Sequence, residues 1–235
     1  MTDLDRWSDR LREPASEPSA QPRRIAELCV HTLAVSGAGI SMISDTGNRG
    51  VICATDDVSA RIEELQVTLG EGPCVDAVGR GGPVLVSDLT DAHDLASDRW
   101  PTFLTAAREV GVVAVFAFPL RMGAIVIGAL DLYRRTAGAL TDTELTMALM
   151  ASEAAGVALL GLNVGDATAV LGDGESNAHR AQVHQATGMV MVQLDVPVEQ
   201  AFLLLRARAF SAGRPLGDLA RDVVERRLRF TPEDL

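Results

Sequence analysis

The C-terminal quarter of the chain carries a concentration of arginine that could bind a polyanion. Residues 179–230 hold eight arginines against five carboxylates, whereas residues 1–175 hold thirteen arginines against twenty-five carboxylates. The whole chain has a formal net charge of −11. A locally positive segment in an acidic protein is typical of a surface that contacts nucleic acid. A solvated helix end, favoured by the helix dipole, would explain Arg226, Arg227 and Arg229 equally well.

Gly188 is a second candidate in the same segment. It interrupts an apolar pattern of helical spacing, where glycine costs about 1 kcal/mol relative to alanine. Two explanations remain open from the sequence. Either another molecule approaches the backbone closely at Gly188, or another helix of the protein packs tightly against it.

The three cysteines are the remaining groups with reactive chemistry. Cys29, Cys53 and Cys74 are too widely and irregularly spaced for a disulfide framework or a metal site. Cys53 and Cys74 could form a redox pair, and Cys74 would gain acidity from a helix N-terminus. Cysteine is, however, among the most buried residue types, so core packing explains them as well. With no metal-ligand set, no paired nucleophile and base and no phosphate-binding loop, we expect no metal, no cofactor and no enzyme activity.

Three short amphipathic helices are expected to position the arginines and Gly188. The apolar spacing predicts helices over 178–193, 197–211 and 215–229. Pro197 and Pro215 stand where a first helical turn tolerates proline, and Gly213 follows the end of the second helix. Phe202 and Phe210 fall at expected core positions. We therefore expect recognition through loop shape, backbone approach and arginine contacts rather than through an aromatic stacking platform.

The middle of the chain has an α+β pattern. It predicts a central antiparallel sheet flanked by helices, with a hairpin turn at 45–48. The expected helices are 25–36, a short helix with Cys74 near its start, 99–110 and 142–162. The expected strands are 38–44, 50–56, 83–87, 112–120 and 124–133. Residues 1–21 resemble a poorly ordered tail, and residues 163–176, which are rich in Gly and Asp, resemble a linker.

Composition limits the class of protein. The chain has 235 residues, of which 47% are hydrophobic, so it can form one or two cores. It has no run of eighteen uncharged apolar residues and no secretory signal at its N-terminus. We expect a cytoplasmic protein that does not bind a membrane.

Residues 177–235 resemble an ANTAR domain. The resemblance rests on Gln185-Ala186-Thr187-Gly188-Met189-Val190-Met191 and on the segments 197–202, 205–206, 219–220 and 223–224. It implies a small three-helix module that binds paired RNA stem-loops in leader transcripts and prevents termination of transcription. The family has lysine where this chain has Thr187. The implied RNA-binding residues are Arg180, His184, Gln185, Thr187, Gly188, Met191, Arg206, Arg208 and Arg214.

Residues 22–162 resemble a GAF domain. The resemblance rests on Gly70-Glu71-Gly72-Pro73-Cys74 and on the segments 37–42, 83–84, 118–120 and 127–130. It implies a sensor or dimerisation domain in which the helices 25–36 and 142–162 join two copies. Its candidate ligand pocket, for a small molecule that the sequence does not identify, consists of Met42, Cys53, Cys74, Trp100, Phe116 and Phe118. Core packing accounts for Phe116 and Phe118 equally well.

The order of the two resemblances implies a sensor coupled to an RNA reader. The expected protein is an α+β GAF domain followed by an all-α ANTAR domain, which acts as a homodimeric transcription antiterminator. Two alternatives stay open. One is a DNA-binding regulator, because residues 198–228 superficially resemble a helix–turn–helix. The other is a GAF-fold redox enzyme that uses Cys53 and Cys74.

Overall fold

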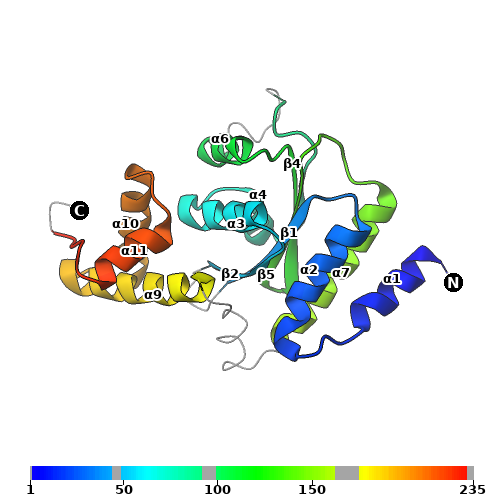
Figure 1. Ribbon diagram of the computed structural model, residues 1–235, viewed down its shortest axis with the longest axis horizontal. Helices are drawn as coiled ribbons and strands as arrows, with labels where there is room; N and C mark the ends of the chain where they lie inside the picture. Colours follow the sequence, from blue (N-terminus) through cyan, green and yellow to red (C-terminus); the bar gives the residue numbers. More distant parts are fainter. Residues whose placement is uncertain (1, 44–48, 92–98, 162–174, 232–235) are drawn as a thin grey trace. The chain divides into compact units, whose positions relative to one another are not determined.

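The computed structural model describes residues 2–43, 49–91, 99–161 and 175–231 (Figure 1). The chain divides into two compact units, Met1–Val170 and Leu171–Leu235. Each unit has its own buried apolar residues. The predicted hairpin turn at 45–48 lies outside the described residues, as does the predicted linker except for its last two residues, which begin a helix.

The first unit is built on a five-stranded antiparallel sheet with the strand order β2-β1-β5-β4-β3. The strands are β1 (Gly37–Ile43), β2 (Arg49–Ala54), β3 (Val84–Val86), β4 (Ala114–Met122) and β5 (Ile125–Arg134). The predicted antiparallel sheet is confirmed. Gly128 lets β1 and β5 approach each other, because a Cβ there would lie 2.1 Å from the carbonyl oxygen of Ser41.

Helices cover both faces of the sheet (Figure 1). One face carries α2 (Gln21–Thr32) and α7 (Asp142–Leu160). The helix α1 (Asp3–Arg12) packs on α7, and the short 3-10 turn η1 (Pro18–Ala20) precedes α2. The other face carries α3 (Asp57–Leu69), α4 (Pro73–Arg80) and α6 (Pro101–Glu109). The sequence pattern did not single out α3. Because strand side chains alternate between faces, β5 presents Leu130 and Leu132 to α2 and α7, and Asp131 and Tyr133 to α3.

A carboxylate at the start of α7 joins three elements. Glu144 completes a capping box with Thr141 at the start of α7. Its Oε1 atom also accepts hydrogen bonds from the backbone N–H of Ala34, at 3.2 Å, and from the guanidinium of Arg134, at 2.7 Å. The side chains of Arg134 and Glu144 are largely buried. This ion pair therefore fixes the end of β5, the segment after α2 and the start of α7 relative to one another.

The segment expected to be a poorly ordered tail contains a helix. Thr2 caps α1 with a capping box, and the amphipathic face of α1 buries Trp7 and Leu11. Trp7 is only 1% exposed, and its indole N–H donates a 2.9 Å hydrogen bond to the carbonyl oxygen of Met147 on α7. The expectation of disorder is therefore wrong for residues 2–12, because one large aromatic side chain anchors the helix.

By length and composition alone, α7 is apolar enough to cross a membrane, with a mean hydropathy of 1.3. In this fold it is a core helix, since Met147, Ala148, Ala151, Ala155 and Leu159 are buried in the first unit. Its apolar composition therefore has an explanation within the domain.

The second unit is a three-helix module of α9 (Glu175–Leu194), α10 (Val198–Ser211) and α11 (Leu216–Val224). Its core contains Ala186, Val190, Leu194, Ala201, Leu205, Ala209, Leu216, Leu219, Ala220, Val223 and Phe230. The third helix ends five residues earlier than predicted. Arg226 adopts a left-handed conformation with φ of 61°, and the chain then turns so that Phe230 is buried and its N–H bonds to the side chain of Gln193.

Replacing Trp7 with alanine should destabilise the first unit. Loss of a fully buried tryptophan costs about 3 kcal/mol or more. We expect a fall of that size in the free energy of unfolding, measured by urea titration with Trp100 fluorescence as the probe. Asp9→Ala on the exposed face of α1 serves as the control. Equal stability of both variants would show that α1 is not anchored through Trp7.

Candidate functional site

A group of buried polar side chains lies between the sheet and the helices α3 and α4. It consists of Ser41, Glu63, Gln66, Cys74 and Asp131, and we call it the polar cluster. The side-chain N–H of Gln66 donates to Asp131 Oδ2 at 2.8 Å, and Gln66 Oε1 accepts the backbone N–H of Cys74 at 2.7 Å. The Ser41 hydroxyl lies 3.4 Å from the Cys74 sulfur. Gln66 thus links α3 to the start of α4 and to β5.

The segment Gly70-Glu71-Gly72-Pro73-Cys74 forms the junction that positions this cluster. Gly70 ends α3 in a left-handed conformation, and Pro73 occupies the first turn of α4. Gly72 has φ of 132°, and a Cβ there would lie 2.7 Å from Gln66 Oε1. The Glu71 carboxylate accepts the backbone N–H groups of Thr102 and Phe103 at the start of α6. One short motif therefore joins α3, α4 and α6.

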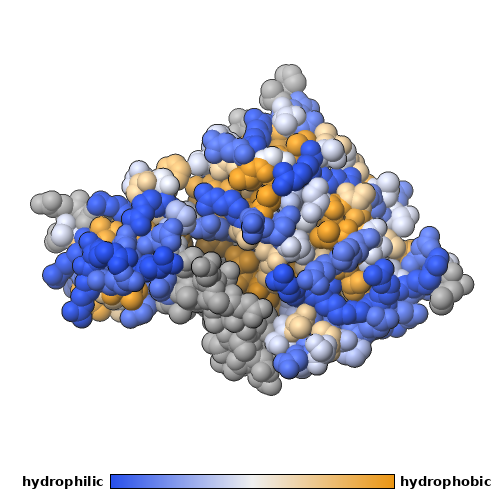
Figure 2. All heavy atoms as spheres, viewed as in Figure 1, coloured by the Kyte–Doolittle hydropathy of each residue, from blue (hydrophilic) through white to orange (hydrophobic). Residues whose placement is uncertain are grey.

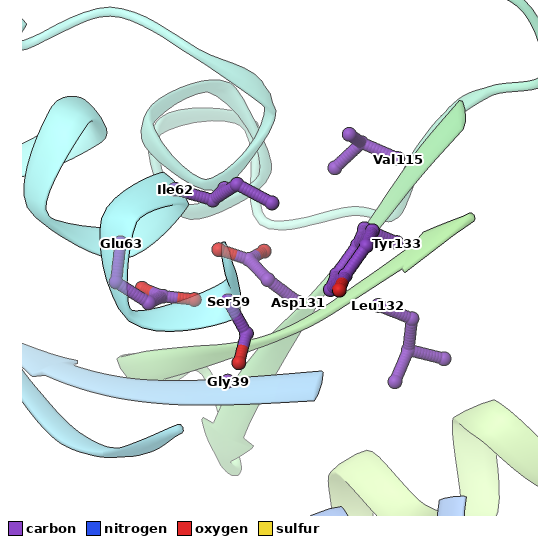
Figure 3. Close-up of a pocket in the computed structure, with 8 residues that line it drawn as sticks. All are labelled: Gly39, Ser59, Ile62, Glu63, Val115, Asp131, Leu132 and Tyr133. Carbon is purple, nitrogen blue, oxygen red and sulfur yellow. The ribbon is translucent and has the colours of Figure 1, made fainter. Parts of the chain in front are cut away.

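A small cavity lies beside the polar cluster, between α3 and the sheet (Figure 3). Its volume of about 10 Å³ is close to what a single water molecule requires. The cavity is lined by Gly39, Ser59, Ile62, Glu63, Val115, Asp131, Leu132 and Tyr133. The ligand atoms of Glu63, Cys74 and Asp131 all lie within 4.8 Å of one another, so among the described residues these three have the donor types and spacing to hold a metal ion.

The six residues predicted from the sequence to line a ligand pocket do not meet around the cavity that the described residues form. None of Met42, Cys53, Cys74, Trp100, Phe116 and Phe118 lines the cavity. By strand alternation, Met42, Cys53, Phe116 and Phe118 face α2 and α7, whereas Cys74 and Trp100 belong to the α3, α4 and α6 side. The sheet thus separates the six residues. Phe116 and Phe118 are fully buried core residues.

Glu63, Gln66 and Asp131 were not predicted from the sequence to be site residues. The sequence does contain an indication of this site, because Asp131 is a charged residue within the apolar run of β5. Glu63 and Gln66 likewise fall on the buried stripe of α3, next to Ile62 and Leu65. Polar residues at core positions mark sites that need a specific partner.

Cys53 and Cys74 are not brought together as a redox pair. Cys53 pairs with Ile40 across the strands and shares its face, whereas Ser41, which contacts Cys74, points to the opposite face. Burial raises the pKa of Cys29 and that of Cys53 to about 12. At neutral pH these two thiols are protonated and are poor nucleophiles.

The predicted RNA-binding residues of α9 are divided between its two sides. His184, Gln185 and Met191 are exposed, so these three share the outer side of the helix with half-buried Gly188. Thr187, which was also predicted to bind RNA, is only 2% exposed, and its hydroxyl donates to the carbonyl oxygen of Val183 at 2.7 Å. The Thr187 side chain therefore bonds to its own helix and is not exposed to solvent. The side chain of Arg180 lies outside the described residues.

Gly188 is not explained by helix packing. A Cβ at this position would meet no described atom within 4 Å beyond its neighbours and its own helix backbone. Of the two explanations left open by the sequence, tight packing against another helix of the module is therefore wrong. The open space at Gly188 remains available to another molecule.

Arg206 on α10 and Arg214 at its exit are held by contacts with neighbouring side chains. The Arg206 guanidinium lies over the Phe202 ring, 5.7 Å from its centroid. Arg208 is exposed, and Arg214 forms a 2.8 Å ion pair with Asp222. Hydrogen bonds from Arg214 and Arg227 lower the pKa of Asp222. The core expectation for the aromatics is wrong for Phe210, which is 55% exposed, and Phe202 is only half-buried.

Tyr133, which lines the cavity, forms a 2.6 Å hydrogen bond with Asp56, the N-cap of α3. Burial and this bond raise the pKa of Tyr133 to about 12. Burial opposes ionisation of Asp56, but the hydrogen bonds from Tyr133 and Ser59 outweigh it and hold the pKa of Asp56 below its ordinary value. The pair thus stabilises a neutral phenol beside an ionised carboxylate.

Tyr133→Phe should lower the free energy of unfolding by about 1 kcal/mol at neutral pH, since the bond is charge-assisted but Asp56 is exposed. Because the pKa of Tyr133 is raised in the folded protein, the hydrogen bond contributes its full stability at any pH below the ordinary tyrosine pKa of about 10. The contribution is then lost as the pH rises through about 12. Urea unfolding of both proteins between pH 7 and 12 should show the difference shrinking above pH 10. A difference independent of pH would contradict this account.

Comparisons with known proteins agree with the two units. A GAF domain model matches residues 20–160, and an ANTAR domain model matches residues 175–224. The GAF domain from a phosphoenolpyruvate-protein phosphotransferase of Coxiella burnetii is similar in fold, with 12% identity, a TM-score of 0.50 and coverage of 67% of this chain and 90% of that chain. The corresponding GAF domain from Acinetobacter is similar as well, with 10% identity and a TM-score of 0.50. The match covers 68% of this chain and 95% of that chain. None of the curated proteins compared with the chain matches it. The chain therefore belongs to the GAF domain family and carries an ANTAR domain, the composition of an RNA-binding antitermination regulator with a sensor domain.

Proposed function

We propose that the chain acts as a homodimer that binds two stem-loops of a nascent leader transcript and prevents termination of transcription. The observation that carries the proposal is the ANTAR match to a three-helix unit in which residues 179–230 hold more arginines than carboxylates. Each copy contributes one RNA module. The protein works in the cytoplasm, where transcripts are made.

The outer side of α9 is the proposed contact with the RNA backbone. His184 and Gln185 supply hydrogen-bonding groups there, and Gly188 leaves space for a close approach. Arg206 and Arg208 on α10 supply positive charge for phosphates. Hydrophilic residues cover most of the surface of this unit seen in Figure 2, with a few apolar residues between them. Such a mixed surface suits a hairpin loop, which presents phosphates and unstacked bases together.

Duplex DNA is the less suitable ligand. A recognition helix must enter the major groove and present several side chains to base edges. The nine residues of α11 bury Leu219, Ala220 and Val223, and Arg221 pairs with Asp218 on the same helix. Arg227, beyond the helix, pairs with Asp222. The side chains of the third helix are therefore used in the core and in ion pairs within the module, rather than being presented to a DNA groove.

The helix layer of the GAF unit is the proposed dimer interface. On α7, Leu149, Val157 and Leu160 are exposed, and Val157 is 70% exposed. They recur at a spacing that places them on one side of the helix, with Glu153 between them. A second copy of the same helix would cover this apolar side, since a twofold axis brings identical surfaces together.

The polar cluster is the proposed sensor element. Its cavity has room for about one water molecule, so a larger ligand must move α3 or α4 away from the sheet. Gln66 connects such a movement to β5, whose Leu130 and Leu132 form part of the core beneath α2 and α7. The signal would thus reach the dimer layer through one strand.

A competition assay tests the function. The full chain is incubated with fluorescent RNA carrying two tandem hairpins, and unlabelled double hairpin, single hairpin or duplex DNA is added at fixed salt. A linked second site should favour the double hairpin over the single hairpin by about a hundredfold or more. Val157→Glu places a charge in the dimer interface and should abolish this preference without weakening the single-hairpin affinity. Leu85→Glu, at another exposed apolar residue, is the matched control.

The outcomes of this assay are distinct. A preference for duplex DNA, or binding to neither nucleic acid, would contradict the RNA function. A wild-type protein that sediments as a monomer at micromolar concentration and still prefers the double hairpin would contradict the dimer. Loss of the preference in Leu85→Glu as well would show a general defect rather than a broken interface.

Gly188→Ala separates stability from binding. Alanine meets no described neighbour there and is a better helix former, so the module should gain about 1 kcal/mol of stability. The added methyl group would occupy the space at which the RNA backbone approaches, so affinity should fall. Thermal melting and RNA titration of the same variant measure the two effects. An unchanged affinity in a stabilised protein would exclude Gly188 from the RNA contact.

A further inference from the structure

We propose that Phe210 on α10 is a stacking site for an unpaired nucleobase of the RNA loop, supported by a ladder of Phe202, Arg206 and Phe210. This inference rests on the proposed RNA-binding function and adds a ligand subsite to it. The residues that carry it are ordinary hydrophobic and cationic side chains, and what distinguishes them is their arrangement on one side of α10.

The first observation is the exposure of a large aromatic ring. Phe210 has a position that the sequence assigns to the core, yet it is 55% exposed, and Leu203 is 56% exposed on the same helix. The core of the module is formed without it, by Ala201, Leu205 and Ala209 from α10. Phe210 therefore contributes little to the module's core, and its ring is available to another molecule.

The second observation is the spacing of the ladder. Residues 202, 206 and 210 are four apart, so their side chains lie one above another on one side of the helix. The Arg206 guanidinium already lies over the Phe202 ring, 5.7 Å from its centroid. This cation–π contact holds the planar guanidinium one turn from Phe210. An aromatic ring, a guanidinium plane and a second aromatic ring thus follow one another along α10.

The charge around the ladder selects the class of partner. Arg208 lies two residues before Phe210 and Arg214 four residues after it, within residues 179–230, which hold eight arginines and five carboxylates. An apolar ring among guanidinium groups matches a nucleobase with its adjoining phosphates better than it matches an apolar protein surface. A base must leave its stack to lie on Phe210. The site therefore favours hairpin loops over paired duplexes, which keep their bases stacked.

The test uses the full chain and a double-hairpin RNA that the wild-type protein has selected from a library with randomised loops. Each selected loop adenine is replaced in turn by 2-aminopurine, whose fluorescence reports stacking. We expect Phe210→Ala to lower the affinity by about five-fold to a hundredfold, in line with the loss of one stacked base. It should also abolish the fluorescence change at one loop position.

Two further variants make the result specific. Phe210→Tyr keeps an aromatic ring and should bind RNA like the wild type. Leu203→Ala removes an equally exposed apolar side chain from the same helix and should leave affinity unchanged. Because Phe210 is exposed, its variants should melt at the wild-type temperature, which separates a binding defect from unfolding.

The inference would be overturned if Phe210→Ala bound the selected RNA like the wild type with the same 2-aminopurine signal. It would also be overturned if Leu203→Ala lost as much affinity, because the helix face would then act as a general apolar surface. Failure of the wild-type chain to select any hairpin is a different result. In that case the proposed RNA function itself fails, and the stacking site, which rests on that function, fails with it.

Discussion

The two hydrogen bonds of the Gln66 side chain are the interaction on which the GAF unit depends most directly. One amide joins α3, the first turn of α4 and the strand β5. Since all three partners are buried, removing the amide would leave the Cys74 N–H and the Asp131 carboxylate without their bonds to it in a site of low dielectric constant. The geometry of Gly72 follows from the same constraint, because only a residue without a Cβ fits against the Gln66 carbonyl group.

Apolar periodicity and turn residues were sufficient to predict the antiparallel sheet, the start of α7 and the three C-terminal helices. These signals are local, so they survive without knowledge of tertiary contacts. The errors have non-local causes. Trp7 is ordered by a carbonyl group 140 residues away, and Cys53 and Cys74 are separated by a sheet whose register the sequence does not display. Phe210 looked like a core residue because periodicity does not reveal when smaller neighbours already complete the core.

The two units use polar groups in opposite ways. In the GAF unit, carboxylates, an amide and a thiol are enclosed in the core, where their hydrogen bonds select one arrangement of α3, α4 and the sheet. In the ANTAR unit, the described core is apolar apart from Thr187, whose hydroxyl bonds to its own helix, and guanidinium groups lie outside the core in contact with Phe202 and Asp222. A buried polar core suits a unit that responds to a small molecule, and an exterior of positioned cations suits one that binds a large polyanion.

The position of Asp131 between Leu130 and Leu132 has a consequence for how the sheet assembles. A slip of β5 by one residue would turn the carboxylate into the apolar layer beneath α7 and bring two leucines against Glu63 and Gln66. The penalty falls on both faces at once, so misaligned pairings of β5 are strongly disfavoured. The Asp131 carboxylate in the central strand thereby disfavours incorrect strand pairing during folding, in addition to its hydrogen bond in the folded protein.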